Sequence, residues 1–583
     1  KTLANADFNR NFKKDELPVK KGDIIAYTGD TGTRHPHLHF EIRDANHNPV
    51  NPLQFEGLSV EDNTKPLIKK IAIVPVSGRT LLNNSPENLI LTPVVLGNGR
   101  YSVRQPVAVN SDFAIEISTY DIVKGLWNKY GPARIDMYLN DSLRFSKVAD
   151  QFSYSNNGLI TLDRNFQLMV EGKGRFIRMW RFDEAADFPF YKTKSKGIIA
   201  PATDQFMARL EVFDFNDNKS SIDVKFLKEN IVAPHILAVE ADSTHLHCTI
   251  ERDTLTHLYR QLDLAWVTGA GAIIKAAKMV NFTKTDTTYR FSTELKEGLI
   301  LQISGISIDS GNELYSFYNP AGENSNNNVT VDYIHNTNSF VTQLSFVRAP
   351  SKTPQLFLQN SNSFKTLRLI PLTPVKYISA DNSFSNWKNI HTIELRDNDQ
   401  IIKRMPVPFK MLTEKDAGKI ELENFRFTYD KDFVYDTLMA TVYDDHDFIN
   451  GKFNLLSGIF TIAPDNQLLK NSGEISINYP DSLNNIQQVG VYSLSSSRAH
   501  FAGAIVDTSQ KTISANISGM GSYALLRDDI APIIEDVYPA QGLYYKRNSV
   551  KKLKATIDDK LSKIAGETAI TMKLDNKTVI AEW

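Results

Sequence analysis

The sequence predicts a mainly β protein built from serial β-sandwich domains, and three observations support this. Short apolar or alternating runs rich in Ile, Val, Phe and Tyr recur along the chain, as in residues 67–76, 113–122 and 209–215. Turn residues separate the runs, and Asn-rich turns such as 322–328 are frequent. Helical 3.6-residue periodicity is scarce, with residues 254–266 as the best short helix candidate. Closely spaced strands with turns between them are typical of β-sandwiches.

Length and composition limit the classes of protein to which this chain can belong. At roughly 100–200 residues per domain, the 583 residues suggest about three to six domains. Lys and Arg number 66 against 67 Asp and Glu, so no excess of positive charge favours a nucleic acid or an anionic membrane surface, and a nucleic-acid role is excluded. The single cysteine, Cys248, excludes an internal disulfide and fits a bacterial envelope or cytoplasmic protein. No stretch approaches the roughly 18 apolar residues of a transmembrane helix.

Pro-containing junctions predict where domains begin. Residues 61–68, 228–236 and 527–539 share acidic or Asn residues, a Pro and then alternating apolar residues, which we interpret as the entry strand of an Ig-like β domain. Another Pro-containing junction spans 347–355. The predicted domains are an Ig-like β domain at 61–230, a β-sandwich domain at 231–347, β domains at 348–430 and 431–529, and the start of a truncated Ig-like domain at 530–583.

Two local patterns refine this division. Residues 213–227 predict a hairpin that closes a β domain, with Asn216 and Asp217 at its turn. Residues 530–583 are too few for a self-sufficient sandwich, so we expect the sequence to be cut short there. The first residues lack both an initiator Met and the apolar core of a signal peptide, so we expect a processed or cut start that an export signal preceded.

Residues 35–42, "HPHLHFEI", carry the main chemical signal. Because side chains alternate along a strand, His37, His39 and Glu41 would share one face. The opposite face would present a core-facing apolar row of Leu38, Phe40 and Ile42. Two imidazoles at this spacing lie roughly 6–7 Å apart, too far for a mutual hydrogen bond. The spacing suits one imidazole that binds a metal and another that reaches a water or substrate beside it.

Such pairs also arise on ordinary exposed strands. His245 and His247 form a second His-x-His pair without the surrounding features, and we interpret them as surface residues, although His257 and Cys248 could complete a site. The acidic residues around His446 could likewise suggest a metal, but an exposed turn between strands is favoured. The context of each pair must therefore decide its meaning.

The context of His37 and His39 consists of three ordered pieces, at 19–32, 36–43 and 48–55. Together they resemble the end of the catalytic domain of the lysostaphin-type (LytM-like) zinc metallopeptidases, which cut peptide bonds in peptidoglycan. The resemblance is strongest to multidomain Bacteroidetes-type members, in which Ig-like β domains follow the peptidase. It implies that residues 1–60 are the C-terminal part of a β-rich peptidase domain.

The resemblance also implies roles for single residues. His39 corresponds to the zinc ligand, and His37 to the catalytic residue that positions or deprotonates the attacking water. A neutral imidazole can act as a general base near pH 7. Glu41 either orients an imidazole or is a surface carboxylate without a role. At His35 the family usually has a small residue.

The family takes two more zinc ligands, a His and an Asp, and a further active-site His from sequence well upstream. No His precedes His35 here, so we expect the chain to be an incomplete fragment that alone binds zinc weakly and catalyses nothing. A His-x-x-x-Asp motif ahead of Lys1 in the gene would decide between a fragment and a protein that has lost its catalytic half.

The predicted function is that of a zinc-dependent endopeptidase acting on cross-link or stem peptides of peptidoglycan, in the periplasm or cell envelope. Zinc is the expected cofactor, and peptidoglycan peptide and envelope proteins docked on the β domains are the expected partners. The alternative is a non-catalytic envelope scaffold or binding protein with a remnant peptidase domain. An extracellular adhesin, which needs no histidine pair, ranks last.

Overall fold

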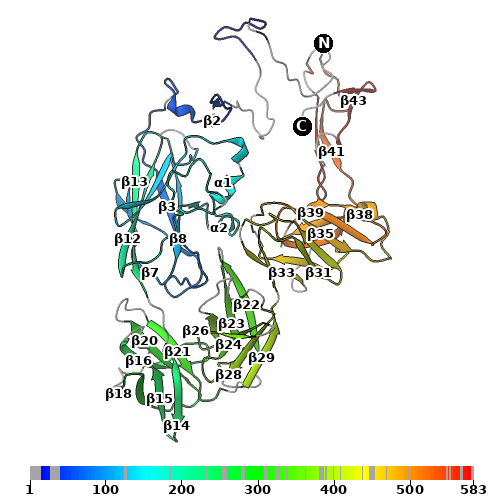
Figure 1. Cartoon of the computed structure of the whole chain (residues 1–583). Coiled ribbons are helices and arrows are strands. Elements are labelled where there is room, and N and C mark those ends of the chain that lie inside the picture. Colours follow the sequence, from blue (N-terminus) through cyan, green and yellow to red (C-terminus); the bar gives the residue numbers. More distant parts are fainter. Residues whose placement is uncertain are drawn as a thin grey trace.

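A computed structural model gives the architecture (Figure 1). It describes residues 13, 15–25, 40–58, 60–123, 128–156, 158–183, 185–229, 234–252, 259–276, 283–307, 313–322, 328–336, 339–360, 363–379, 387, 390–397, 400–407, 409–435, 437–445, 453–465, 467, 469–495, 498–546, 549–550, 553–564 and 569–579. Strands form nearly all of the regular structure there, in many small antiparallel sheets, which confirms a mainly β fold. None of the helices in these ranges is both long and apolar enough to span a bilayer.

The first sandwich follows a short hairpin at the start of the described chain. The hairpin consists of β1 (Ile42–Arg43), β2 (Pro49–Val50) and the 3-10 helix η1 (Pro52–Gln54). The sandwich elements are β3 (Leu67–Pro75), β4 (Leu89–Leu91), β5 (Val94–Gly97), β6 (Arg100–Ser102), β7 (Val107–Val109), β8 (Phe113–Tyr120), β9 (Arg134–Leu139), β10 (Ser142–Val148), η2 (Tyr154–Asn156), α1 (Leu159–Leu162), α2 (Phe166–Val170), β11 (Ile177–Arg178), β12 (Gln205–Phe213) and β13 (Lys219–Lys228).

Two sheets face each other across the core of this sandwich. One has the order β11-β8-β3-β4, and the other runs β10-β9-β12-β13-β6-β5, with β7 also paired to β13. Strands β12 and β13 alternate buried and exposed residues, as expected when one face of a sheet is covered. They pair from Gln205↔Leu227 to Phe213↔Lys219, and Asp217 at their turn has φ +60°, which confirms the predicted closing hairpin.

The smaller sheet is buried on both faces. Ile71 and Ile73 of β3 enter the core between the sheets, whereas Ala72 and Val74 pack with Trp180 in a second cluster on the other face. Helices α1 and α2 lie beside this sheet in Figure 1. The continuous apolar run of β3 therefore reflects burial on two sides.

The second sandwich contains β14 (Ile236–Ala241), β15 (His245–Glu251), β16 (Tyr259–Val267), β17 (Ile273–Ala276), β18 (Thr283–Lys284), β19 (Thr288–Glu294), β20 (Ile300–Ser307) and β21 (Glu313–Tyr318). Its sheets have the orders β14-β15-β19-β18 and β17-β16-β20-β21. The helix expected at 254–266 is wrong, because β16 occupies Tyr259–Val267. Leu264 faces the sandwich core and Ala265 a second cluster, so apolar residues on both faces of a strand imitated a helical pattern.

The third sandwich contains β22 (Val329–Asn336), β23 (Ser339–Phe346), β24 (Gln355–Gln359), β25 (Phe364–Leu367), β26 (Leu369–Thr373), β27 (Lys376–Ser379), β28 (Thr392–Asp397) and β29 (Gln400–Pro406). Its sheets have the orders β22-β23-β27-β26 and β25-β24-β28-β29, and Trp387 is buried in the core between them.

The fourth sandwich is the largest after the first. It contains β30 (Phe409–Leu412), β31 (Gly418–Leu422), β32 (Phe425–Tyr429), β33 (Leu438–Asp444), β34 (Phe460–Ala463), β35 (Gly473–Asn478), η3 (Ile486–Gln488), β36 (Val489–Leu494), β37 (Ala499–Gly503), β38 (Ile505–Asp507), β39 (Thr512–Ile517) and β40 (Gly521–Arg527). Its sheets run β30-β33-β34-β40-β36-β37 and β31-β32-β35-β39-β38. Two hairpin-like pairs follow, β41 (Ile533–Tyr538) with β42 (Lys554–Asp558) and β43 (Met572–Leu574) with β44 (Lys577–Val579).

The strand pairing does not follow the predicted domain boundaries at 347/348 and 430/431. The first division would separate β23 from its neighbour β27, and the second would separate β32 from β35. Pro350 and Pro354 lie where the chain crosses from one sheet to the other within the third sandwich, so a Pro-containing junction also marks a crossover inside a domain. The domain limits themselves stay a prediction.

Gly197 offers a test of packing in the first sandwich. Its φ is +76°, and a Cβ there would lie 2.2 Å from the Met179 carbonyl oxygen and 2.7 Å from the Trp180 Cα atom. Gly172 has a similar φ of +71° but open space around it. A Gly172→Ala variant therefore measures the cost of backbone strain without a steric clash. We expect Gly197→Ala to lower the free energy of unfolding of the first sandwich by about 1–3 kcal/mol more than Gly172→Ala, measured by hydrogen exchange of the β8 amides. Equal losses would contradict the clash.

Candidate functional site

A tight turn precedes the histidine segment. The Asp23 amide donates to the Lys20 carbonyl oxygen over 3.0 Å, and the Lys20 amide donates to the Asp23 carboxylate over 2.7 Å. Gly22 has φ +102° at the third position of this turn, where a type II turn requires a positive φ. Residues Lys20–Asp23 therefore form a tight turn ahead of the histidine segment.

Asp44 organises the hairpin that follows the histidines. Its Oδ1 accepts hydrogen bonds from the amides of Asn46 and Asn48, each over 2.9 Å. These bonds close the turn between β1 and β2, in which Ile42 faces Val50. The hydrogen bonds from Asn48 are the main cause that lowers the pKa of Asp44. The carboxylate is thus held ionised as a structural anchor of the turn.

Asn51 ends the hairpin and starts η1. Its side-chain oxygen accepts from the Leu53 amide over 3.0 Å, and Pro52 occupies the first helical turn, where its missing N–H costs nothing. Within the stretch 48–55, Asn48, Asn51 and Pro52 therefore each have a local structural role.

Glu41 contacts the first sandwich. Its Oε2 accepts from the Tyr154 hydroxyl over 2.7 Å, and its Oε1 accepts from the Arg43 Nε over 2.7 Å. The Arg43 guanidinium also lies over the Tyr154 ring, with 5.0 Å between the Arg43 Cζ and the ring centroid. The hydrogen bond to Glu41 is the largest cause that raises the pKa of Tyr154. These contacts give Glu41 a structural role that neither predicted reading included, because its carboxylate ties the hairpin to η2.

Further contacts fix the same junction. The Gln151 side chain donates to Asp44 Oδ2 over 2.7 Å, and Val50 forms an isolated antiparallel bridge with Gln151. The amide of Asn51 donates to the Asp150 carbonyl oxygen over 3.3 Å. The end of the histidine segment is therefore docked on the loop that follows β10.

The predicted site residues His37 and His39 lie outside the described residues, as do His35, Leu38, Gly29 and Gly32. Their roles stay predictions. The expected core-facing row is wrong at Phe40, which is 61% exposed. In the part of the chain that the structure describes, β1 and β2 form a sheet of only two strands, and most of the Phe40 side chain next to it is exposed.

The second His-x-His pair behaves as a surface feature. His247 bonds through Nδ1 to the Ser292 hydroxyl over 2.8 Å and through Nε2 to the Asp242 carboxylate over 3.2 Å. Cys248 is buried in the sandwich core, and burial raises the pKa of its thiol to about 12. Because alternate residues of β15 point to opposite faces, Cys248 cannot join His245 and His247 around one ion.

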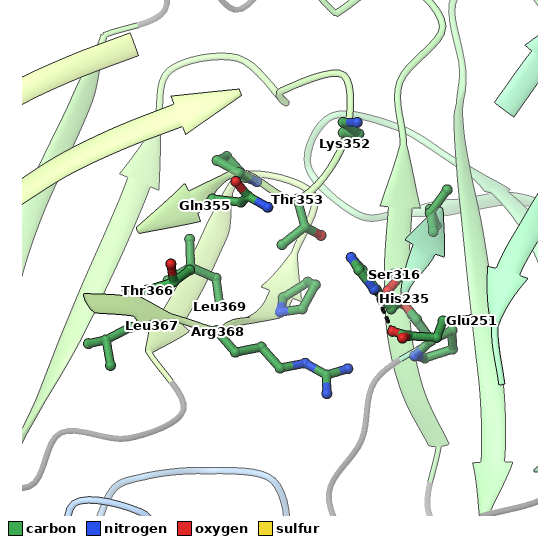
Figure 2. A pocket seen from close by; sticks show the side chains of 14 residues that line it. His235, Glu251, Ser316, Lys352, Thr353, Gln355, Thr366, Leu367, Arg368 and Leu369 are labelled. Carbon is green, nitrogen blue, oxygen red and sulfur yellow. Dashed lines mark hydrogen bonds and ion pairs between the residues drawn. The ribbon is translucent and has the colours of Figure 1, made fainter. Parts of the chain in front are cut away.

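A pocket of about 380 Å³ lies between the second and third sandwiches. Figure 2 shows His235 and Glu251 on one wall and Arg368 on the other. His235 Nδ1 bonds to Glu251 over 2.7 Å, and the Ser316 hydroxyl donates to the Pro234 carbonyl oxygen. In the residues that the structure describes, no hydrogen bond joins the His235 ring to the Ser316 hydroxyl, so the two are not arranged as a base and its nucleophile.

Sequence reasoning missed one cluster of buried carboxylates in the first sandwich. Asp62, Asp121 and Asp214 each place a carboxylate oxygen within 4.8 Å of the others. One signal was present in the sequence, because Asp214, Asn216 and Asn218 alternate at the turn of the β12–β13 hairpin. The other two aspartates are distant in sequence, so only the fold brings them together.

Comparison with known proteins finds a family match for one part of the chain. Residues 6–52 match the model of Peptidase family M23, which supports an M23 (LytM-type) peptidase domain there and a metallopeptidase type of chemistry. No curated protein matches the chain. The matched stretch includes His37, His39 and the β1–β2 hairpin.

Proposed function

We propose that this protein is a zinc-dependent endopeptidase that cuts cross-link or stem peptides of peptidoglycan. The observation that carries the proposal is the match of residues 6–52 to Peptidase family M23, with the His37-x-His39 pattern inside it. The docking of the β1–β2 hairpin on the first sandwich supports it, because a strand that presents catalytic groups must be held in place.

The donor types fit zinc. Imidazole nitrogen is a common zinc ligand, and a catalytic zinc takes three protein ligands with one position open for water. His39 would supply one ligand, and the lysostaphin-type pattern places a His and an Asp as the others ahead of His35. When bound, zinc supplies a water that ionises near neutral pH.

His37 would act beside the ion. Its neutral imidazole would accept the proton of the attacking water at a ring nitrogen and would hold the proton until the leaving amine takes it. An extended strand would keep His37 roughly 6–7 Å from His39, so both rings could face the same scissile peptide without competing for one position.

The proposal also includes the cellular location of the protein and a role for its β domains. Peptidoglycan lies outside the inner membrane, so the protein would act in the periplasm or cell envelope. The four sandwiches would hold the peptidase near its substrate by docking on envelope proteins or glycan. Their closely packed cores suit such a spacer.

Zinc removal tests the proposal. The protein made from the complete gene, including any coding sequence ahead of Lys1, should release peptides from purified peptidoglycan, as followed by mass spectrometry. A zinc chelator should lower the rate by on the order of 100-fold or more, and added Zn²⁺ should restore it, because the attacking water depends on the ion.

A non-catalytic envelope scaffold predicts a different result. It would bind peptidoglycan without cleavage, with or without the chelator. Absence of cleavage by a complete gene product that carries a His-x-x-x-Asp motif ahead of Lys1 would contradict the proposed hydrolase.

A further inference from the structure

Three aspartates meet at one end of the first sandwich. Asp62 lies just before β3, Asp121 just after β8 and Asp214 just after β12. They are 7%, 5% and 3% exposed, respectively. One carboxylate oxygen of each lies within 4.8 Å of those of the other two. Three separate chain segments thus converge on a single buried group of oxygens.

The cluster has no counter-charge in the part of the chain that the structure describes. No ion pair there involves Asp62, Asp121 or Asp214. Burial, followed by the charge of Asp214, raises the pKa of Asp121 to about 6. Burying like charges without a neutralising partner is costly, so the fold retains an unfavourable arrangement unless a cation accompanies it.

Two of the carboxylates also have orphaned oxygens. Asp62 Oδ2 and Asp121 Oδ1 are buried and have no hydrogen-bond partner. The opposite oxygen of Asp62 is held, because its Oδ1 accepts from the Thr64 amide over 3.0 Å. A buried oxygen without a donor calls for a ligand, and carboxylate oxygens are the ligands that hard cations prefer.

Hydrogen bonds within the β12–β13 turn hold the third carboxylate, that of Asp214, in position. Asp214 Oδ1 accepts from the amides of Asn216 and Asn218, each over 2.8 Å. The Asn218 side chain donates to Asp214 Oδ2 over 2.7 Å and to the Asp62 carbonyl oxygen over 2.9 Å. The Asn216 side chain donates to the Val60 carbonyl oxygen over 2.8 Å. The β12–β13 turn therefore holds the segment that enters β3.

We propose that Asp62, Asp121 and Asp214 form a site for a divalent cation, and that this cation is Ca²⁺. All three side chains offer oxygen and none offers nitrogen or sulfur, which excludes the usual transition-metal donors. Oxygens within 4.8 Å of one another fit around a centre at the 2.3–2.6 Å that Ca²⁺–oxygen bonds require. Backbone carbonyls and water would complete the six to eight ligands.

The position gives the site a mechanical consequence. Asp62 lies between the stretch that matches the peptidase family and β3 of the first sandwich. A cation bound to Asp62 on one side and to Asp121 and Asp214 on the other would fix this connection. Calcium would therefore stiffen the attachment of the peptidase segment, whatever reaction that segment performs.

Calcium titration of the whole chain tests the site. After treatment with a chelator, the protein is titrated with CaCl₂ in a calorimeter, alongside the variants Asp121→Asn and Asp214→Asn. We expect each variant to bind Ca²⁺ on the order of 100-fold more weakly at this site, because a charged ligand is lost. The matched control is Asp217→Asn, an exposed residue of the same turn with φ +60°, a conformation that Asn tolerates, and its affinity should be unchanged.

Thermal unfolding separates a metal site from a merely structural cluster. Without calcium, Asp121→Asn should be at least as stable as the unsubstituted chain, because it removes repulsion between buried carboxylates. Calcium should raise the melting temperature of the unsubstituted chain and of Asp217→Asn, but not of Asp121→Asn or Asp214→Asn. Equal calcium responses in all four proteins, or no response in any, would overturn the proposal.

Discussion

Replacing His39 with alanine in the complete gene product is expected to release zinc and to abolish peptide cleavage, whereas replacing His37 leaves the zinc and stops turnover. A catalytic zinc that loses one of three protein ligands is bound much more weakly. Loss of a general base costs on the order of 10²–10⁴ in rate while the metal remains. Metal content by mass spectrometry and cleavage kinetics on peptidoglycan peptides together measure the two effects.

The second histidine pair supplies the control for this experiment. His245→Ala and His247→Ala change the same pattern on an exposed strand, where His247 bonds to Ser292 and Asp242. Neither substitution should alter zinc content or turnover. Full zinc occupancy in His39→Ala, or an active His37→Ala protein, would contradict the assigned division of roles.

The mainly β architecture was predictable because strand periodicity is a local property. In β12 and β13 each buried residue is followed by a more exposed one, and the turn residue Asp217 adopts a positive φ, as the sequence pattern indicates. The tight turn at Gly22 is also determined locally, because glycine readily adopts a positive φ. Each of these features is decided by a few neighbouring residues, so the sequence alone suffices.

Features that depend on distant segments were not predictable. Strand β16 is covered on both faces, and the periodicity of a single segment cannot show which neighbours cover it. Phe40 belongs to an apolar row, but its burial depends on layers that the local pattern does not specify. Asp62, Asp121 and Asp214 come from three strand ends, so only tertiary structure places them together. The roles of His37 and His39 rest on resemblance and stay predictions.

A buried ion pair in the first sandwich leads to the largest expected effect on stability. Glu116 of β8 is fully buried, and its Oε1 accepts from Arg178 Nε over 3.3 Å and from Trp180 Nε1 over 3.1 Å. Its Oε2 accepts from the Asn165 side chain over 2.8 Å. Arg178 Nη1 also donates to the Leu162 carbonyl oxygen over 2.9 Å. The guanidinium therefore neutralises a carboxylate that has no access to water.

Arg178→Ala should lower the free energy of unfolding of the first sandwich by about 3–5 kcal/mol, because it leaves the Glu116 charge buried and unpaired. Chemical denaturation of this multidomain chain is not expected to be two-state, so a local measurement is required. Hydrogen exchange of the β8 amides, followed by mass spectrometry, reports the opening of this sandwich alone. Protection there should fall steeply in the variant.

Arg209→Ala is the matched control, because it removes the same side chain from an ion pair of the same sandwich at its surface. Arg209 donates to Asp223 over 2.8 Å and to Asp141 over 3.1 Å, and its side chain is 35% exposed. Water can solvate both carboxylates after the substitution, so the loss should stay below about 1 kcal/mol. The two arginines differ chiefly in burial, and comparable losses of β8 protection would show that desolvation of Glu116 does not set the stability of this domain.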